Sequence, residues 1–277
     1  MYKLIAIDLD NTLLDDNKEI SKENIKFINR LIENGYEIVI ATGRRYFSAK
    51  SFIQSINKPL TILANNGSIA RETKNNNILF EKLLSTKDFR IIVERGKARN
   101  LHPIVHVDSF ELGYDLIVEM DIENPAYGNY FAKDEKRYKK VNSYLDIEKE
   151  KILAIVYLGN KLDMEDFYLE INENHSDKYN FHIVENIKAA EALLEIMHPL
   201  GCKWQGLQEY AKERGIKERE IIAIGDDNND ITMLKNAGLG IAMKNASKNV
   251  KSIADIITER DNNQSGVAFE LARILKL

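Results

Sequence analysis

The sequence IAIDLDNTLL occupies residues 5–14 and decides how the chain folds. The apolar residues at positions 4–7 predict a short buried strand that ends at two aspartates, Asp8 and Asp10. Residues two apart on an extended chain project to the same side, so the two carboxylates can converge on one object. Two neighbouring negative charges are costly unless a cation lies between them or one carboxyl group keeps its proton. Either arrangement indicates chemistry, whereas the alternative is a surface strand closed by solvated aspartates.

Three further buried strands are predicted to end in polar residues or glycine. Residues 37–41 are followed by Thr-Gly-Arg, residues 60–64 by Asn-Asn-Gly, and residues 221–224 by Gly-Asp-Asp-Asn-Asn-Asp. A helical pattern over residues 21–35 joins the first two strands, which makes a strand-helix-strand unit with parallel strands. Ligands bind at the carboxyl ends of the strands in such sheets. We therefore expect an α/β fold with a doubly wound, Rossmann-like and mostly parallel sheet.

The middle of the chain has a different pattern. Strands of period two are mixed with two helical segments there, which predicts a separate α+β module. We expect an α/β core made of residues 1–84 and 192–277, interrupted by an inserted cap domain at residues 85–191. A strand at residues 193–197 is expected to open the second core segment. The charged stretch at residues 133–151 is expected to be a solvated helix.

Composition and charge narrow the class of partner. The 277 residues are 44% hydrophobic and 30% charged, enough for about two globular domains. The net charge is −4 without a long basic run, so neither nucleic acid nor a membrane surface is an expected partner. Because the first strand begins directly after Met1, we expect no signal peptide, and no apolar run reaches the ~20 residues that cross a bilayer. With the single cysteine, Cys202, unable to form an internal disulfide, these features predict a cytoplasmic protein.

Four motifs follow one another along the chain. They are Asp8-Leu9-Asp10-Asn11-Thr12-Leu13, Thr42-Gly43-Arg44, Lys203 with Gly206 and Leu207, and Gly225-Asp226-Asp227-Asn228-Asn229-Asp230. In this order they resemble the motifs of the haloacid dehalogenase superfamily. The large insert and the Asn66-Gly67 turn are similar to those of its Cof-type phosphatases with a type IIB cap. The resemblance covers the whole chain, and it implies phosphatase activity.

The resemblance implies roles for the acidic residues. Asp8 would be the nucleophile that forms an aspartyl-phosphate, and Asp10 would protonate the leaving alcohol and later activate water. For the first step Asp10 must be protonated, which requires a pKa raised by its surroundings. Mg2+ would contact the side chains of Asp8 and Asp226 and the backbone carbonyl of Asp10, and hard oxygen ligands suit this ion. Asp230 is expected to support the site by orienting Lys203 or the loop.

The remaining motif residues are expected to bind the phosphoryl group. Thr42 offers a hydroxyl group, and Gly43 offers a backbone amide that a phosphate can approach closely. Lys203 would supply a positive charge to the phosphate and to the carboxylate of the nucleophile. Asn229 would make a further contact. By resemblance to the family, the backbone of Leu9 would also donate to the phosphate.

Two motif positions depart from the pattern that is common in the family. Trp204 directly follows Lys203 where glycine is frequent, and Asn11 replaces a frequent glycine after the second aspartate. The indole of Trp204 would either narrow access to the phosphate or pack into the core.

The function that we favour is a Mg2+-dependent phosphatase acting on a small phosphorylated metabolite. Sugar phosphates are the leading class, flavin mononucleotide and pyridoxal phosphate remain open, and the insert would select the organic part of the substrate. A phosphotransferase or mutase could use the same aspartyl-phosphate, although Asp10 as a base for water favours hydrolysis. A phospho-accepting signalling domain also combines acidic residues, threonine and lysine, but the large insert is unlike a compact receiver. A binding protein without activity is disfavoured because every expected charged group is present.

Overall fold

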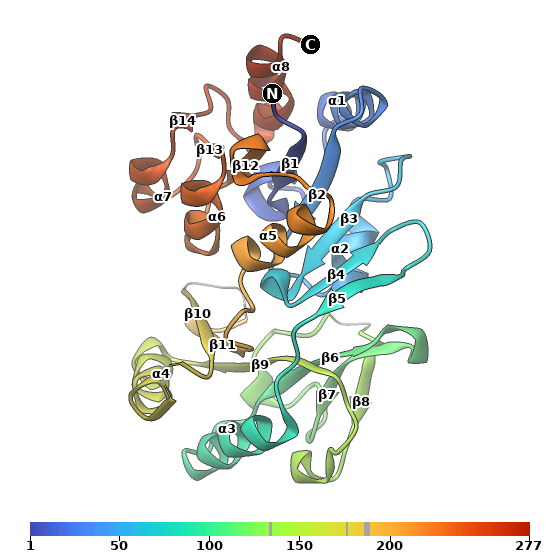
Figure 1. Cartoon of the computed structure of the whole chain (residues 1–277). Coiled ribbons are helices and arrows are strands. Elements are labelled where there is room, and N and C mark those ends of the chain that lie inside the picture. The colour runs from blue at the N-terminus through green and yellow to red at the C-terminus, as the bar shows by residue number, and fades with distance from the viewer. Residues whose placement is uncertain (133–134, 176, 186–188) are drawn as a thin grey trace. The chain divides into compact units, whose positions relative to one another are not determined.

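The structure is a computed structural model that describes residues 1–132, 135–175, 177–185 and 189–277. The described chain divides into two compact units, of which the first comprises residues 1–81 and 202–277 and the second residues 82–201 (Figure 1). The α/β core with an α+β insert is thus as expected, but the boundaries differ from the prediction. The second core segment begins at residue 202, ten residues later than position 192.

The first unit is built on a mostly parallel sheet. Its strand order is β14-β13-β12-β1-β2-β3-β4-β5, with parallel pairing from β14 to β3 and antiparallel pairing beyond. The central strand β1 is buried along its whole length, as the continuous apolar run predicts for a strand in a parallel sheet. The bounds are β1 Leu4–Ile7, β2 Glu37–Ala41, β3 Thr61–Ala64, β4 Ile69–Glu72, β5 Ile78–Glu81, β12 Ile221–Gly225, β13 Leu239–Ala242 and β14 Ile256–Ile257.

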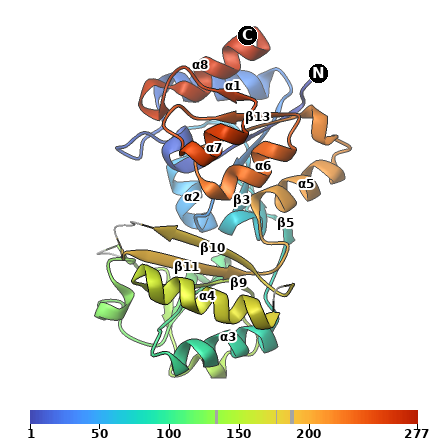
Figure 2. The ribbon, with the colours of Figure 1, turned by 90° about the vertical axis from the view of Figure 1, so that its left-hand side faces the viewer.

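Helices connect these strands. Ser21 caps the start of α1, because its hydroxyl accepts a hydrogen bond from the backbone N–H of Asn24. Helix α1 packs against α8, and α5 packs against α6 (Figure 2). The helices are α1 Lys22–Glu33, α2 Tyr46–Phe52, α5 Lys203–Glu213, α6 Ile231–Asn236, α7 Lys248–Ile253 and α8 Gly266–Leu275, and the short helical turns are η1 Leu9–Leu13, η2 Asn65–Gly67, η6 Glu218–Glu220, η7 Asn228–Asp230 and η8 Asn262–Gln264.

The second unit has its own sheet, in the order β10-β11-β9-β6-β7-β8, antiparallel except between β7 and β8. Its strands are β6 Ile104–Ser109, β7 Tyr114–Val118, β8 Tyr138–Lys140, β9 Ile152–Gly159, β10 Asn180–Glu185 and β11 Ala192–Met197. Its helices are α3 Thr86–Ala98 and α4 Lys161–His175, with short turns η3 Phe110–Leu112, η4 Pro125–Tyr127 and η5 Tyr144–Asp146. The expected helix at 133–151 is wrong, because β8 and η5 occupy this stretch; residues 133–134 lie outside the described part.

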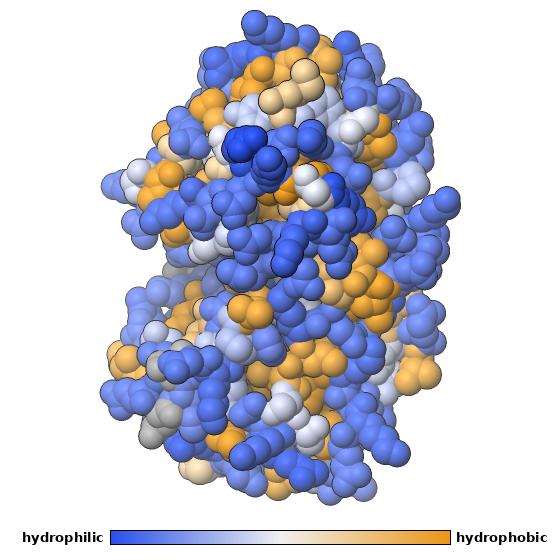
Figure 3. Space-filling model, viewed as in Figure 1, coloured by the Kyte–Doolittle hydropathy of each residue, from blue (hydrophilic) through white to orange (hydrophobic). Residues whose placement is uncertain are grey.

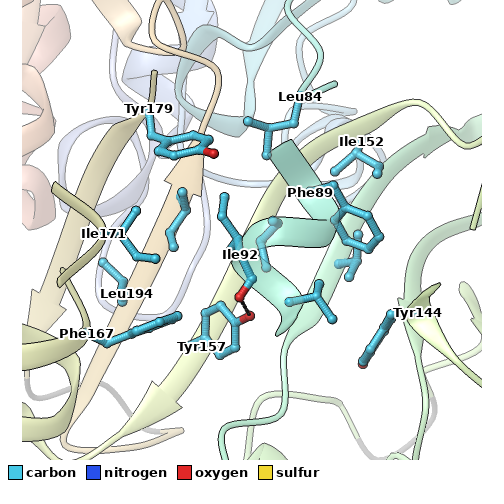
Figure 4. Close-up of a cluster of buried hydrophobic side chains, with 14 of the residues drawn as sticks. Leu84, Phe89, Ile92, Tyr144, Ile152, Tyr157, Phe167, Ile171, Tyr179 and Leu194 are labelled. Atoms are coloured by element: carbon cyan, nitrogen blue, oxygen red, sulfur yellow. Dashed lines mark hydrogen bonds between the residues drawn. The ribbon is translucent and has the colours of Figure 1, made fainter. Parts of the chain in front are cut away.

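The core of the second unit lies between α3, α4 and one face of this sheet (Figure 4). The ring of Tyr157 packs edge-on against Phe167 with centroids 5.0 Å apart, and its hydroxyl donates to the carbonyl of Ile92. Leu194 of β11 is fully buried in this same core. The strand expected at 193–197 therefore exists, but assigning it to the α/β core was wrong. Its apolar side chains fill the insert instead.

The surface matches the charged composition. Hydrophilic residues cover most of the face seen in Figure 3, with apolar residues scattered between them. Within the described residues, no helix combines the length and the apolar character needed to cross a membrane.

Candidate active site

Two acidic segments from opposite ends of the sequence meet at one edge of the first unit's sheet. Asp8 follows β1 and Asp226 follows β12, and these strands are parallel neighbours with Ile7 beside Ile224. Their carboxyl ends are therefore adjacent. Among the described residues, carboxylate oxygens of Asp8, Asp226 and Asp230 lie within 4.8 Å of one another, and all three side chains are buried.

Lys203 lies in the centre of this acidic cluster. Its ammonium group donates to Asp8 Oδ1 at 2.6 Å and to Asp230 Oδ1 at 2.8 Å, and the side chain is 1% exposed. Burial alone would lower the pKa of Lys203, but the charges of Asp230 and Asp8 outweigh burial and raise it. The other oxygen of Asp230 accepts from the backbone N–H groups of Asp226 and Asp227. Asp230 thus links Lys203 to the loop after β12.

The cluster carries more negative than positive charge. Burial raises the pKa of Asp8 well above its usual value, despite the opposing effect of Lys203, and neighbouring carboxylates raise it further. Burial, followed by the charge of Asp230, raises the pKa of Asp226 to about 7. When all three carboxyl groups of the described cluster are ionised, they exceed Lys203 by two charges. A divalent cation with a preference for oxygen ligands, such as Mg2+, fits this donor set in charge and in chemistry.

Thr12 is a site residue that the sequence did not reveal. Its hydroxyl donates to Asp226 Oδ1 at 3.0 Å, and both groups are buried. Directly after Asp8 the chain turns into η1, where Asn11 has φ of 54°, and this turn brings Thr12 back toward Asp226. The only sequence feature that could have indicated this role is a threonine four residues after Asp8. Its hydrogen bond to Asp226, however, depends on the turn η1. Leu9 is fully buried, so its side chain belongs to the core.

Asp10 lies in a different environment. Arg44 holds it with two hydrogen bonds, from Nε to Oδ2 at 2.6 Å and from Nη2 to Oδ1 at 2.7 Å, and Lys18 donates to Oδ1 at 3.0 Å. Burial raises the pKa of Asp10, but hydrogen bonds to Arg44, its charge and Lys18 together outweigh this and lower the pKa. The expectation of a raised pKa for Asp10 is wrong, because two cations stabilise its ionised form.

Arg44 was predicted only as the end of a Thr-Gly-Arg turn. Its guanidinium lies over the ring of Phe52, 4.3 Å from the centroid, and also donates to the hydroxyl of Ser48 at 3.2 Å. These contacts with α2 fix the plane of the guanidinium that faces Asp10. A planar, two-pronged match of this kind is typical of arginine and not of lysine.

Three of the expected phosphate-binding residues, Thr42, Gly43 and Asn229, lie beside Asn66. Asn229 donates from Nδ2 to Asn66 Oδ1 at 2.9 Å, which joins the loop after β12 to η2. A Cβ atom at Gly43 would lie 3.4 Å from the same amide group. Thr42 is buried, and its hydroxyl accepts from the backbone N–H of Arg44. Asn66 has φ of 52°, and its central position was not foreseen from the sequence.

Two glycines let α5 approach this edge closely. Gly67 has φ of 82°, and a Cβ atom there would lie 2.6 Å from the backbone carbonyl oxygen of Cys202. A Cβ atom at Gly206 would lie 3.0 Å from the backbone oxygen of Gly67. The absence of side chains therefore allows the start of α5, with Lys203, to reach the acidic cluster. Trp204 is only 5% exposed, so its indole packs into the core.

The sheet and its motifs define a class of protein. The chain belongs to the haloacid dehalogenase-like hydrolase family, whose profile matches residues 5–271. It is similar to 5-amino-6-(5-phospho-D-ribitylamino)uracil phosphatase YcsE of Bacillus subtilis, with 30% identity over 96% of this chain and 93% of that protein. Phosphatase YwpJ of the same organism is 27% identical, over 99% of this chain and 100% of its own length. A solved haloacid dehalogenase-like hydrolase from Bacteroides thetaiotaomicron superposes with a TM-score of 0.80 and 26% identity, covering 99% of this chain and 100% of that one.

Proposed function

We propose that this protein is a cytoplasmic, Mg2+-dependent phosphatase that hydrolyses small phosphorylated metabolites through an aspartyl-phosphate on Asp8. The observation that carries the proposal is the buried group of Asp8, Asp226, Asp230 and Lys203 at the carboxyl edge of the sheet. A phosphoryl group in transfer carries negative charge, so it needs a positioned nucleophile surrounded by cations. Membership of the hydrolase family and relatives named as phosphatases support the same reaction class.

Asp8 is suited to attack phosphorus. Lys203 offsets the charge of its carboxylate at 2.6 Å and limits its rotation, so that the oxygen facing the substrate is held in place. Because the ammonium group is buried, its attraction for a phosphoryl oxygen is weakly screened by solvent. Asp230, through its contact with Lys203, keeps this cation in position.

The side chains of Asp8 and Asp226 and the backbone carbonyl of Asp10 would hold Mg2+. The ion, when bound, supplies positive charge that draws the phosphoryl oxygens into place and offsets their developing charge. The Thr12 hydroxyl donates a hydrogen bond to Asp226 and so orients this carboxylate, as hydrogen bonds to metal ligands commonly do.

The groups around Asn66 would bind the phosphoryl oxygens. We assign this role to the Thr42 hydroxyl, the Gly43 amide and Asn229, together with the backbone N–H of Leu9 and the ammonium of Lys203. Asp10 would give a proton to the leaving alcohol, against the preference of Arg44 and Lys18 for its ionised form, and would then take a proton from the attacking water. Its contact with Arg44 favours the ionised form that the second of these steps requires.

The substrate that we favour is a phosphorylated polyol or sugar with a primary phosphate ester. A ribityl phosphate chain is present in the compound that gives YcsE its name, and flavin mononucleotide carries the same chain. Sugar phosphates share its hydroxylated carbon chain, whereas pyridoxal phosphate does not. We assign recognition of this organic part to the insert, residues 82–201.

A panel of phosphate esters tests the proposal. The purified protein is incubated with sugar phosphates, flavin mononucleotide, pyridoxal phosphate and 5-amino-6-(5-phospho-D-ribitylamino)uracil, with Mg2+ or with a chelator, and inorganic phosphate is measured. We expect release of phosphate that depends on Mg2+. Transfer to an added sugar without inorganic phosphate would favour a phosphotransferase or mutase. A long-lived phosphoprotein without turnover would favour the signalling alternative.

A further inference from the structure

Lys18 combines a strained backbone with a contact to the proposed acid and base. It lies in the hairpin that follows η1, where Leu14 and Ile20 form an antiparallel bridge. The Asp15 side chain accepts from the backbone N–H groups of Asn17 and Glu19, and the Lys18 backbone N–H donates to the Asp15 carbonyl. This tight turn places Lys18 at φ of 63°, in the left-handed region.

Glycine and asparagine are the residues that usually occupy this turn position. Every residue with a Cβ atom is strained in the left-handed region, and asparagine tolerates it better than lysine because its short polar side chain can hydrogen-bond to the local backbone. Lysine is therefore an unfavourable choice for the turn alone. Strained residues of this kind concentrate at functional sites, where a contact offsets the strain. The contact here is specific: the Lys18 ammonium lies 3.0 Å from Asp10 Oδ1.

Asp10 is thereby held from two elements of the first unit. Arg44, in the turn that follows β2, binds both oxygens of Asp10, and Lys18, from the hairpin, adds a second cation at Oδ1. The two cations lie on different segments, so the carboxylate cannot rotate without breaking at least one contact. The side chain of Lys18 is 40% exposed, which leaves this contact partly screened by solvent.

We propose that Lys18 is a positioning residue for Asp10, retained at a strained turn because its ammonium holds the Asp10 carboxylate in the orientation for proton transfer. The proposal rests on the proposed phosphatase function and adds a residue outside the four motifs. It requires that loss of the charge impairs the reaction while relief of the strain stabilises the fold. If Lys18 had only a structural role in the turn, removing its charge would not impair the reaction.

Three substitutions separate charge from strain. Lys18→Met removes the charge and keeps the strain. Lys18→Arg keeps both, and Lys18→Asn removes the charge and lowers the strain. Lys276 provides a matched control, because it is also a lysine in the left-handed region, with φ of 55°, at the end of α8. Lys276→Asn relieves strain at a position outside the hairpin and the motifs.

The assay compares two substrates with different leaving groups. An alkyl phosphate such as glycerol phosphate needs a proton on its leaving oxygen, whereas p-nitrophenolate leaves readily without one. The ratio kcat/KM reports the step in which the leaving group departs. For Lys18→Met and Lys18→Asn we expect kcat/KM to fall about three- to fivefold with glycerol phosphate and to stay near the wild-type value with p-nitrophenyl phosphate. Lys18→Arg keeps the positive charge, so it should retain most of the wild-type kcat/KM with glycerol phosphate.

Thermal unfolding supplies the second measurement. Lys18→Asn should raise the unfolding midpoint by about 1–3 °C, whereas Lys18→Met should not raise it. Lys276→Asn should not lower the midpoint and should leave both kcat/KM values unchanged.

Equal losses with both esters, or wild-type activity in Lys18→Met, would overturn the role of Lys18. If the wild-type protein releases phosphate neither from these two esters nor from any ester of the panel with Mg2+, the proposed function itself fails and this role falls with it.

Discussion

Asp8 and Asp10 lie two residues apart at the end of β1, yet their surroundings shift the two pKa values in opposite directions. Asp8 is buried with two other carboxyl groups and one lysine, and its pKa is raised. Asp10 is one-third exposed, faces two cations, and its pKa is lowered. Alternation along an extended chain does not by itself give two carboxyl groups the same environment. The loops that close around each group decide which charges it meets.

The difference suits two separate tasks. A carboxyl group among other carboxylates attracts a cation, and a bound cation returns it to the ionised state that a nucleophile and metal ligand needs. A carboxyl group between an arginine and a lysine is fixed in direction but is not enclosed, so it can exchange a proton with water or with a leaving group. Substitutions at Asp8 and its buried neighbours, or at Asp10, change one side of this pair at a time.

The largest effect is expected for Asp8→Asn. An amide cannot form the aspartyl-phosphate, and it contributes less charge to a metal site, so turnover should fall below detection. Release of inorganic phosphate from the best substrate of the panel is the measurement, with circular dichroism to check the fold. The exposed residue Asp146 offers the control variant Asp146→Asn, which should behave as wild type. Activity close to wild type in Asp8→Asn would exclude a covalent intermediate on this residue.

Asp10→Asn should reduce kcat by ~10²–10⁴-fold, the usual contribution of acid and base assistance. The substitution keeps an oxygen that Arg44 can bind, so the hairpin and η1 should keep their conformation. The steady-state rate is measured at saturating substrate and Mg2+, again beside Asp146→Asn. A decrease of less than tenfold would show that another group moves the proton.

The resemblance of the four motifs to a known family, together with polar residues at the carboxyl ends of predicted parallel strands, was enough to predict that Asp8 and Asp226 meet. The contacts of Thr12 and Arg44 were not predictable in the same way. They depend on the irregular turn after Asp8 and on the packing of a guanidinium against α2, and neither leaves a periodic pattern. The strand at 193–197 was predicted but assigned to the wrong sheet, since an apolar strand has the same pattern in either one.

Lys203→Met should destabilise the first unit by about 3–5 kcal/mol, because it leaves buried carboxylates without their cation. Trp204 is the only tryptophan and belongs to the first unit, so its fluorescence during urea unfolding reports on this unit. Lys212, exposed near the end of the same helix, gives the control variant Lys212→Met, expected within about 0.5 kcal/mol of wild type. Equal stability of the two variants would mean that Lys203 does not hold the cluster together.

The smallest and most specific effect concerns pH in the absence of metal. The pKa of Asp226 is about 7 in the folded chain and near 4 when unfolded, so between these values the folded state binds a proton that the unfolded state has released. Its contribution to stability is complete below pH 4 and is lost as pH rises through 7. We expect this contribution to be on the order of 2–4 kcal/mol.

Urea unfolding followed by Trp204 fluorescence, in the presence of a chelator from pH 5 to 8, isolates this contribution when wild type is compared with Asp226→Asn. The stability of the variant relative to wild type should increase with pH, because asparagine has no proton to lose and retains an oxygen for the Thr12 hydroxyl. Saturating Mg2+ should stabilise wild type most at the alkaline end, where Asp226 is ionised, and should have a smaller effect on the variant. Parallel pH profiles for the two proteins would show that the raised pKa does not belong to Asp226, and the contrast with Asp10 would then rest on Asp8 alone.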